Sequence, residues 1–324
     1  MGTAVTFSSN RLEFCPISLF AMVMGLSGLS LAWLQGGRLG IFPGFPALVS
    51  IAFTLVAMVG ILVLYGGKLL RHPARVREEL HHPIRMSFFP TVSISFVLAG
   101  TMLLHVAPAA SFWLWAVGAV GQLGFVLLIL SFWIHHDTFE VQHFNPAWFI
   151  PVVGNVLVPV AGVAHAPAEL NWFYFSVGVL FWLVLMTILF YRVFFHPPLP
   201  ERLMPTLFIL IAPPAVSFLA YVKLTGSLDP FARFAFYSAL FLTLLLFTQA
   251  RRFARLPFAL SWWAYSFPLA AMTVATLTMH ELSGLAFFRH LGTGLHVVLN
   301  AVIALLLVKT FAAARAGKVC APEG

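Results

Sequence analysis

The chain has 324 residues, of which 61% are hydrophobic and only 9% are charged. Soluble globular domains carry about 25% charged residues, so the composition excludes them and predicts one multi-pass membrane domain over residues 1–324. The formal net charge is +8, from 18 Lys and Arg against 10 Asp and Glu. In a membrane protein this excess is typical of cytoplasmic loops, so the expected partner is the lipid bilayer and not nucleic acid.

Apolar runs bounded by charged residues, glycine and proline predict ten membrane-spanning helices. Roughly 20 apolar residues in a helix match a hydrocarbon core of about 30 Å. In chain order the runs lie near residues 16–35, 47–67, 84–106, 110–134, 146–163, 171–193, 204–224, 231–249, 258–279 and 287–310. The loops between them are short, so we expect an all-α fold in which successive helices pack as five antiparallel hairpins.

The loop charges predict the orientation of these helices. If the helices alternate in direction, the 18 Lys and Arg residues divide 14 to 4 between the two sides of the membrane. Cytoplasmic loops carry the excess of Lys and Arg in membrane proteins. We therefore predict that both termini are cytoplasmic and that the protein lies in a bacterial inner membrane.

Prolines divide the ten predicted helices into two classes. Within the predicted bounds the even-numbered helices carry none, whereas the odd-numbered helices carry or begin at Pro16, Pro90, Pro151 with Pro159, Pro213 with Pro214, and Pro268. A proline leaves a carbonyl without its helical partner, and an unpaired carbonyl is costly in lipid. We interpret the odd helices as an inner ring of kinked helices around a central pore, enclosed by an outer ring of even helices. The alternative is that proline is simply commoner in membrane helices.

The stretch Ser261–Pro268, with the sequence SWWAYSFP, opens the ninth predicted helix. Pro268 is expected to bend this helix and to leave the carbonyl of Ala264 without a partner. Phe267 lies beside the expected bend, where its ring can fill a pore. Core packing is the alternative for Phe267, because the chain has 34 phenylalanines and most of them must pack.

Acidic residues are absent from the centres of the predicted helices. All ten lie outside the spans or at their edges, whereas proton relays and cation-coupled pumps generally use buried carboxylates. A pathway of hydroxyl, amide and backbone groups without fixed negative charge favours anions over cations. The candidate lining residues are Gly25, Ser93, Asn155, Ser217 and Ser266. For each side chain, a hydrogen bond within its own helix is the alternative.

Other kinds of chemistry find little support in the sequence. Five potential metal ligands lie between the fourth and fifth predicted helices, with a spacing that matches no metal motif: His135, His136, Asp137, Glu140 and His143. Cys15 and Cys320 lie near opposite ends of the chain and are expected to be free thiols. No catalytic triad, phosphate loop or nucleotide motif is present, so we predict no enzymatic activity, no metal and no cofactor.

Five sequence runs characterise the odd-numbered helices: PISLFAMVMGLSGLSLAW, HPIRMSFFPTVSISFVLAG, NPAWFIPVVGNVLVPVAG, MPTLFILIAPPAVSFLAY and SWWAYSFPLAAMTVATL. They resemble the signature runs of the tellurite-resistance/dicarboxylate transporter (TehA) family, to which the plant guard-cell slow-type anion channels also belong. The resemblance covers nearly the whole chain.

This resemblance implies a homotrimer in which each protomer has ten helices, arranged as five hairpins around its own pore. It also implies that a phenylalanine of the ninth helix occludes the pore. The matching residue is Phe267, with Phe258 as the weaker candidate. The implied function is an anion channel for small anions such as chloride and nitrate. The alternative is a secondary transporter of dicarboxylates or of oxyanions such as tellurite, so the expected partners are inorganic or organic anions.

Overall fold

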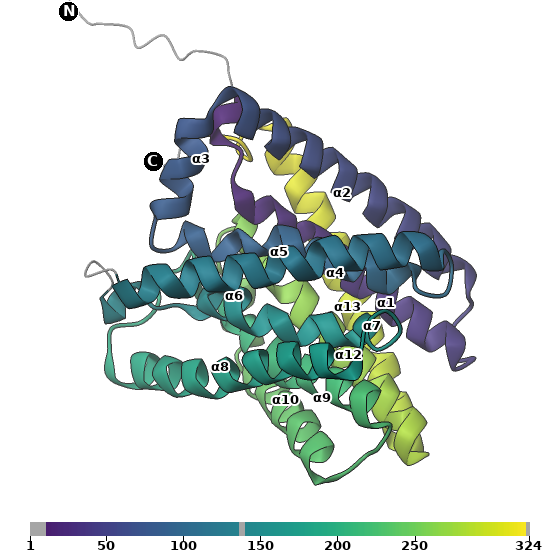
Figure 1. Ribbon diagram of the computed structural model, residues 1–324. Helices are drawn as coiled ribbons and strands as arrows, with labels where there is room; N and C mark the ends of the chain where they lie inside the picture. The colour runs from purple at the N-terminus through teal and green to yellow at the C-terminus, as the bar shows by residue number, and fades with distance from the viewer. Residues whose placement is uncertain (1–10, 136–139, 322–324) are drawn as a thin grey trace, which may run out of the picture.

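The computed structural model describes residues 11–135 and 140–321, and within these ranges it is helical and contains no strand (Figure 1). The α-helices are α1 (Phe20–Arg38), α2 (Phe45–Arg71), α3 (Pro73–His81), α4 (Pro90–Leu103), α5 (Pro108–His135), α6 (Phe149–Val153), α7 (Val158–Gly162), α8 (Ala168–Phe195), α9 (Ala212–Thr225), α10 (Pro230–Thr248), α11 (Ala250–Ala254), α12 (Ser266–Ser283) and α13 (Ala286–Arg315). The 3₁₀ helices are η1 (Arg11–Phe14), η2 (Ile17–Leu19), η3 (Arg85–Phe88), η4 (Val141–His143), η5 (Pro146–Trp148), η6 (Gly154–Leu157), η7 (Met204–Ile211) and η8 (Leu260–Tyr265).

Eight helical segments of the described chain are long and apolar enough to cross a membrane. They are Ile17–Arg38, Phe45–Arg71, Arg85–Leu103, Pro108–His135, Ala168–Phe195, Met204–Thr225, Pro230–Thr248 and Ala286–Arg315. The other two predicted spans take a different form: Pro146–Gly162 is a shorter apolar stretch divided into four helices, and η8 leads into α12. The described chain is therefore an all-helical integral membrane protein, in which eight helical segments qualify as single spans and the predicted spans 146–163 and 258–279 are each divided between shorter helices.

The proline-bearing segments share one local pattern, in which a 3₁₀ helix leads into an α-helix that has proline in its first turn. Pro90 is the first residue of α4, Pro159 the second of α7 and Pro268 the third of α12. Pro213 and Pro214 follow the first residue of α9. The first-turn N–H groups of an α-helix have no partner inside the helix, so a proline there removes no bond.

The bend expected at Pro268 is therefore a junction between two kinds of helix and not a break inside one α-helix. Residues 260–265 are 3₁₀, and the α-helix begins only at Ser266. The Ser266 hydroxyl donates a hydrogen bond to the carbonyl of Trp263 at 2.5 Å. Pro16 differs from the other prolines because it lies just before η2, which leads into α1.

Contacts among the proline-bearing segments follow chain order and return to the start. The helix α1 packs on α4, α4 on α7, α7 on α9, α9 on α12, and α12 again on α1. Each of these helices also packs against the long helix that follows it, namely α2, α5, α8, α10 and α13. In Figure 1, α2 runs along one margin of the molecule and α8 and α10 lie toward the other, with α12 between them.

Burial separates the two sets of helices. Over the most apolar 18 residues of each span, 61% to 78% are buried in the three long segments that contain α1, α4 and α9. The corresponding share is between 22% and 39% in α2, α5, α8, α10 and α13. These five helices expose large apolar side chains, as a surface in contact with lipid requires.

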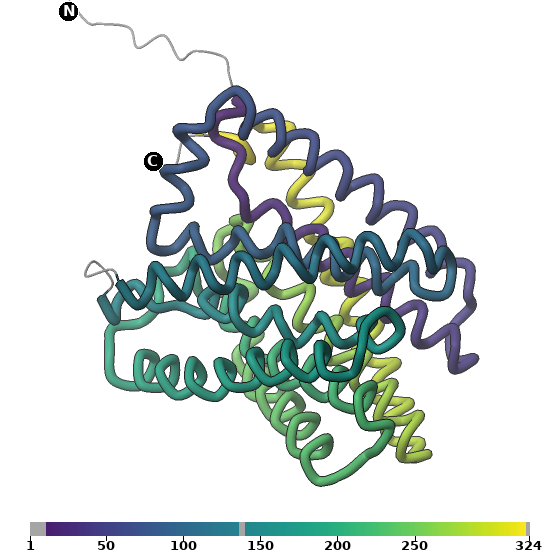
Figure 2. The backbone as a smooth tube through the Cα atoms, viewed as in Figure 1, coloured from purple at the N-terminus to yellow at the C-terminus, as the bar shows by residue number. Residues whose placement is uncertain are grey.

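The described chain begins and ends at the same end of the molecule, where the purple and yellow segments meet in Figure 2. Cys15 and Cys320 form a disulfide there, with their Cα atoms 4.5 Å apart. The prediction of two free thiols is therefore wrong. The two cysteines are separated by 305 positions in the sequence, and they come together only because the helices return the chain to its starting side.

Candidate functional site

A cavity of about 710 Å³, which we name cavity 1, is enclosed by all five proline-bearing segments. Its wall includes residues of each segment: Ala21, Thr91, Val156, Pro213 and Phe267. The 3₁₀–α junctions therefore surround this cavity. Two exposed residues, Arg202 and Lys318, also line it, so it extends from the interior to the surface.

A second cavity of about 620 Å³, cavity 2, lies toward the opposite ends of the same segments. It is lined by Arg38 at the end of α1, Thr101 of α4, Val160 of α7, Lys223 of α9 and Thr278 of α12. The segments that surround cavity 1 with their first turns therefore surround cavity 2 with their last turns.

Three residues line both cavities: Leu157, Val216 and Phe267. Phe267 is the largest of them, is only 9% exposed, and packs beside Gly28. The other phenylalanine considered, Phe258, lines cavity 1 alone and lies 5.7 Å from the ring of Trp262. Of the two candidates, Phe267 is the one at the boundary between the cavities.

Positive charge exceeds negative charge on the wall of cavity 1. Arg85, Arg202 and Lys318 line it together with one carboxylate, Glu79. Lys68 neutralises this carboxylate, because its Nζ lies 2.8 Å from Oε2 of Glu79. The cavity therefore carries a net positive charge, which favours anions.

Cavity 2 has the same sign of charge. Arg38 and Lys223 line it with one carboxylate, Glu281, which Arg38 pairs at 2.5 Å. Gln35 also donates to Glu281, at 3.0 Å. Among the described residues Lys223 has no ion-pair partner within 4.0 Å, so its charge is available at this end of the cavity.

The five residues predicted to line a pore are absent from the walls of both cavities. They are Gly25, Ser93, Asn155, Ser217 and Ser266. The Ser93 hydroxyl donates to the Pro90 carbonyl of its own helix at 2.8 Å, and the Asn155 amide donates to the Val152 carbonyl at 2.8 Å. These two contacts agree with the alternative of a hydrogen bond within the local helical segment, whereas the buried Ser217 hydroxyl forms no hydrogen bond among the described residues. Gly25 faces Ser266 closely, since a Cβ built on Gly25 would lie 2.7 Å from the Ser266 Cβ.

Other hydroxyl-bearing residues line cavity 1, notably Ser18, Thr91 and Thr206, and the hydroxyls of Thr91 and Thr206 each donate to a carbonyl three residues earlier. Each lies one or two residues after a proline, Pro16, Pro90 and Pro205 respectively. A hydroxyl residue one or two positions after a proline therefore marks this wall in three of the odd-numbered helices.

The geometry is that of two positively charged cavities that share three lining residues, Leu157, Val216 and Phe267. A model of the voltage-dependent anion channel (SLAC1) family matches residues 15–311 of the chain. The chain belongs to this family. Its membership confirms the resemblance to the TehA proteins and the plant slow-type anion channels.

Individual family members are similar along most of the chain. A protein named as a tellurite resistance protein TehA homolog, from Haemophilus influenzae, is 27% identical over 305 residues, covering 91% of this chain and 89% of the relative. The S-type anion channel SLAH3 of Arabidopsis thaliana is 30% identical over 270 residues, covering 81% of this chain and 42% of the relative. An uncharacterized transporter of Methanocaldococcus jannaschii is 26% identical over 324 residues, covering 90% of this chain and 93% of the relative.

The histidine-containing loop considered as a metal site is only partly described. His136 and Asp137 lie outside the described residues. Within the ranges that the structure does describe, no group of three His, Cys, Asp or Glu side chains is placed to hold a metal ion. The His143 ring instead accepts a hydrogen bond from the backbone N–H of Glu140 at 3.2 Å.

Proposed function

We propose that the protein is an anion channel in which Phe267 occludes a path formed by cavity 1 and cavity 2. The observation that carries the proposal is that Phe267 is the one large aromatic residue lining both cavities. Apolar constrictions block ions by excluding water from the bore. The excess of Arg and Lys over carboxylate on both walls supports anions as the permeant species, with chloride and nitrate as the smallest candidates.

The Phe267→Ala variant tests this proposal directly. Removing the ring joins the two cavities, so we expect a several-fold increase in chloride and nitrate flux into proteoliposomes, or in current across planar bilayers. The matched control is Phe258→Ala, which alters only the wall of cavity 1 and should leave the flux near that of the parent protein. Equal flux in the parent protein and Phe267→Ala would reject Phe267 as the gate.

The proposal includes the arrangement around the path. Five kinked segments containing α1, α4, α7, α9 and α12 form an inner ring, and five straight helices form an outer ring, as five hairpins in one domain. The closed cycle of contacts among the inner helices and the greater burial of α1, α4 and α9 support this arrangement. We further propose a homotrimer with one path in each protomer and both termini in the cytoplasm of a bacterium.

A secondary transporter of dicarboxylates or oxyanions such as tellurite is the second candidate. The similarity to a tellurite resistance protein TehA homolog favours it. The same preparations distinguish the two candidates, since a coupled transporter gives saturable, pH-driven malate uptake with little current. A channel gives currents that follow the anion gradient.

A further inference from the structure

The residues that follow α13 form part of the wall of cavity 1. The chain turns back at Gly317, where φ is 70°, and Lys318, Val319 and Ala321 then line the cavity. We refer to residues 316–321 as the C-terminal segment. Val319 and Cys320 pack against an apolar cluster that includes Cys15. The C-terminal segment therefore covers part of the open end of the cavity.

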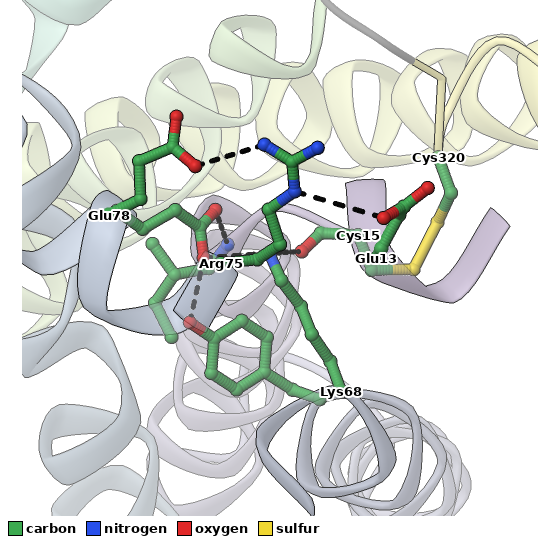
Figure 3. Close-up of polar contacts among 9 residues, drawn as sticks. Glu13, Cys15, Lys68, Arg75, Glu78 and Cys320 are labelled. Carbon is green, nitrogen blue, oxygen red and sulfur yellow. Dashed lines mark hydrogen bonds and ion pairs between the residues drawn. A yellow bond between two sulfur atoms is a disulfide. The ribbon is translucent and has the colours of Figure 1, made fainter. Parts of the chain in front are cut away.

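One covalent bond holds the far end of this segment. The amide of Lys318 donates to the Ala313 carbonyl at 2.9 Å, but in the described chain Val319, Cys320 and Ala321 form no hydrogen bond. Cys320 is instead joined to Cys15 by the disulfide, which Figure 3 shows beside Lys68 and Arg75. Without the disulfide, only apolar contacts would keep these three residues on the cavity wall.

The other side of the disulfide is firmly anchored. Cys15 is 3% exposed, and its carbonyl accepts a hydrogen bond from Nζ of Lys68 at 2.8 Å (Figure 3). Arg75 of α3 contacts Glu13 at 3.7 Å and Glu78 at 3.0 Å. Breaking the disulfide would therefore leave the N-terminal side in place and release the C-terminal segment.

The predicted cytoplasmic location of the Cys15–Cys320 disulfide indicates that this bond can be reduced and re-formed. The distribution of Lys and Arg assigns this end of the molecule to the cytoplasm, where disulfides are usually transient or redox-sensing. Cys320 is partly exposed whereas Cys15 is buried, so a reductant reaches the sulfur of Cys320 first. The two sulfur atoms therefore differ in their accessibility to a reducing protein.

We propose that thiol–disulfide exchange at Cys15–Cys320 controls whether the C-terminal segment covers cavity 1. The thiolate of a dithiol reductant attacks Sγ of Cys320, and the S–S bond breaks with Cys15 leaving as a thiolate that takes up a proton. The second thiol of the reductant then displaces Cys320, which is also protonated. Two electrons pass to the disulfide, and the reductant becomes a disulfide. Release of the segment widens the entrance, an effect on flux that rests on the proposed channel function.

The experiment uses the full-length Phe267→Ala protein, so that the gate does not mask the entrance, with Phe267→Ala/Cys320→Ser as the matched control. After mild oxidation, peptide mapping should find the Cys15–Cys320 link. Dithiothreitol should then increase amide hydrogen exchange in residues 318–321 and raise chloride flux at least about twofold. The control should show the higher exchange and flux with or without dithiothreitol.

Three results would overturn the inference: no linked peptide after oxidation, no change in exchange or flux on reduction of linked protein, or a control that behaves like the oxidised protein. Hydrogen exchange does not depend on conduction. A Phe267→Ala protein without anion flux therefore rejects the channel proposal, while exchange still decides whether the disulfide holds the C-terminal segment.

Discussion

At the scale of single residues, the buried pair of Lys68 and Glu79 is an unusual feature for a membrane protein. The two side chains are 2% and 6% exposed, and their charged atoms lie 2.8 Å apart. The carboxylate also accepts hydrogen bonds from the hydroxyl of Tyr65 at 2.8 Å and from the amide of Ile17 at 3.4 Å. Burying charges is tolerable only when their hydrogen-bonding groups find partners, and here Lys68 donates to Glu79 and to the Cys15 carbonyl while Glu79 accepts from three neighbouring residues.

The Lys68→Met variant should destabilise the protein by about 3–5 kcal/mol, because it leaves the Glu79 carboxylate buried without a countercharge. The double variant Lys68→Met/Glu79→Gln removes both charges and should recover much of the lost stability. Thermal unfolding in detergent micelles measures both effects. A single variant as stable as the parent protein would show that the pair contributes nothing to the fold.

At the scale of the helices, the sequence identified most segments within a few residues of the observed bounds. The proline pattern also separated the more buried helices from the exposed ones. It did not show that residues 260–265 are 3₁₀, because the choice between 3₁₀ and α depends on what the backbone packs against. Nor did it show the contact of Cys15 with Cys320, which forms only after all the helices have assembled.

The contact between α1 and α12 provides a prediction about close packing. A Cβ built on Gly28 would lie 2.6 Å from the Cβ of Ala270 and 3.4 Å from Cδ2 of Phe267. Gly28→Ala should therefore separate the two helices and cost about 1–3 kcal/mol, as overpacking does. Gly28→Ala/Ala270→Gly transfers the methyl group to the other helix and should restore the parent unfolding temperature. If the double variant is no more stable than the single one, the clash with Ala270 is not the cause.

At the scale of the whole molecule, composition was enough to predict a multi-pass membrane protein. The absence of acidic residues from the helix centres predicted that the transported ions are anions. The cavities themselves were beyond sequence reasoning, because their walls combine side chains from five segments spread along the chain. The sequence therefore could not show that Ser93 and Ser266, which we expected to line a pore, use their hydroxyls to bond Gln122 and the Trp263 carbonyl. Glu79 and Glu281 lie on cavity walls, yet each is paired, so the positive charge of both walls persists.

The charge of cavity 2 can be tested through Lys223, whose ammonium group has no ion-pair partner among the described residues. A positive wall raises the local concentration of anions, and salt screens this effect over a Debye length of about 10 Å at 0.1 M. In the Phe267→Ala background, Lys223→Gln should therefore lower chloride flux at low ionic strength and have a smaller effect in concentrated salt. Arg233→Gln is the matched control, because Arg233 is exposed at the start of α10 and lines neither cavity. Equal losses in the two variants would show that flux responds to overall charge, and not to charge on the wall of cavity 2.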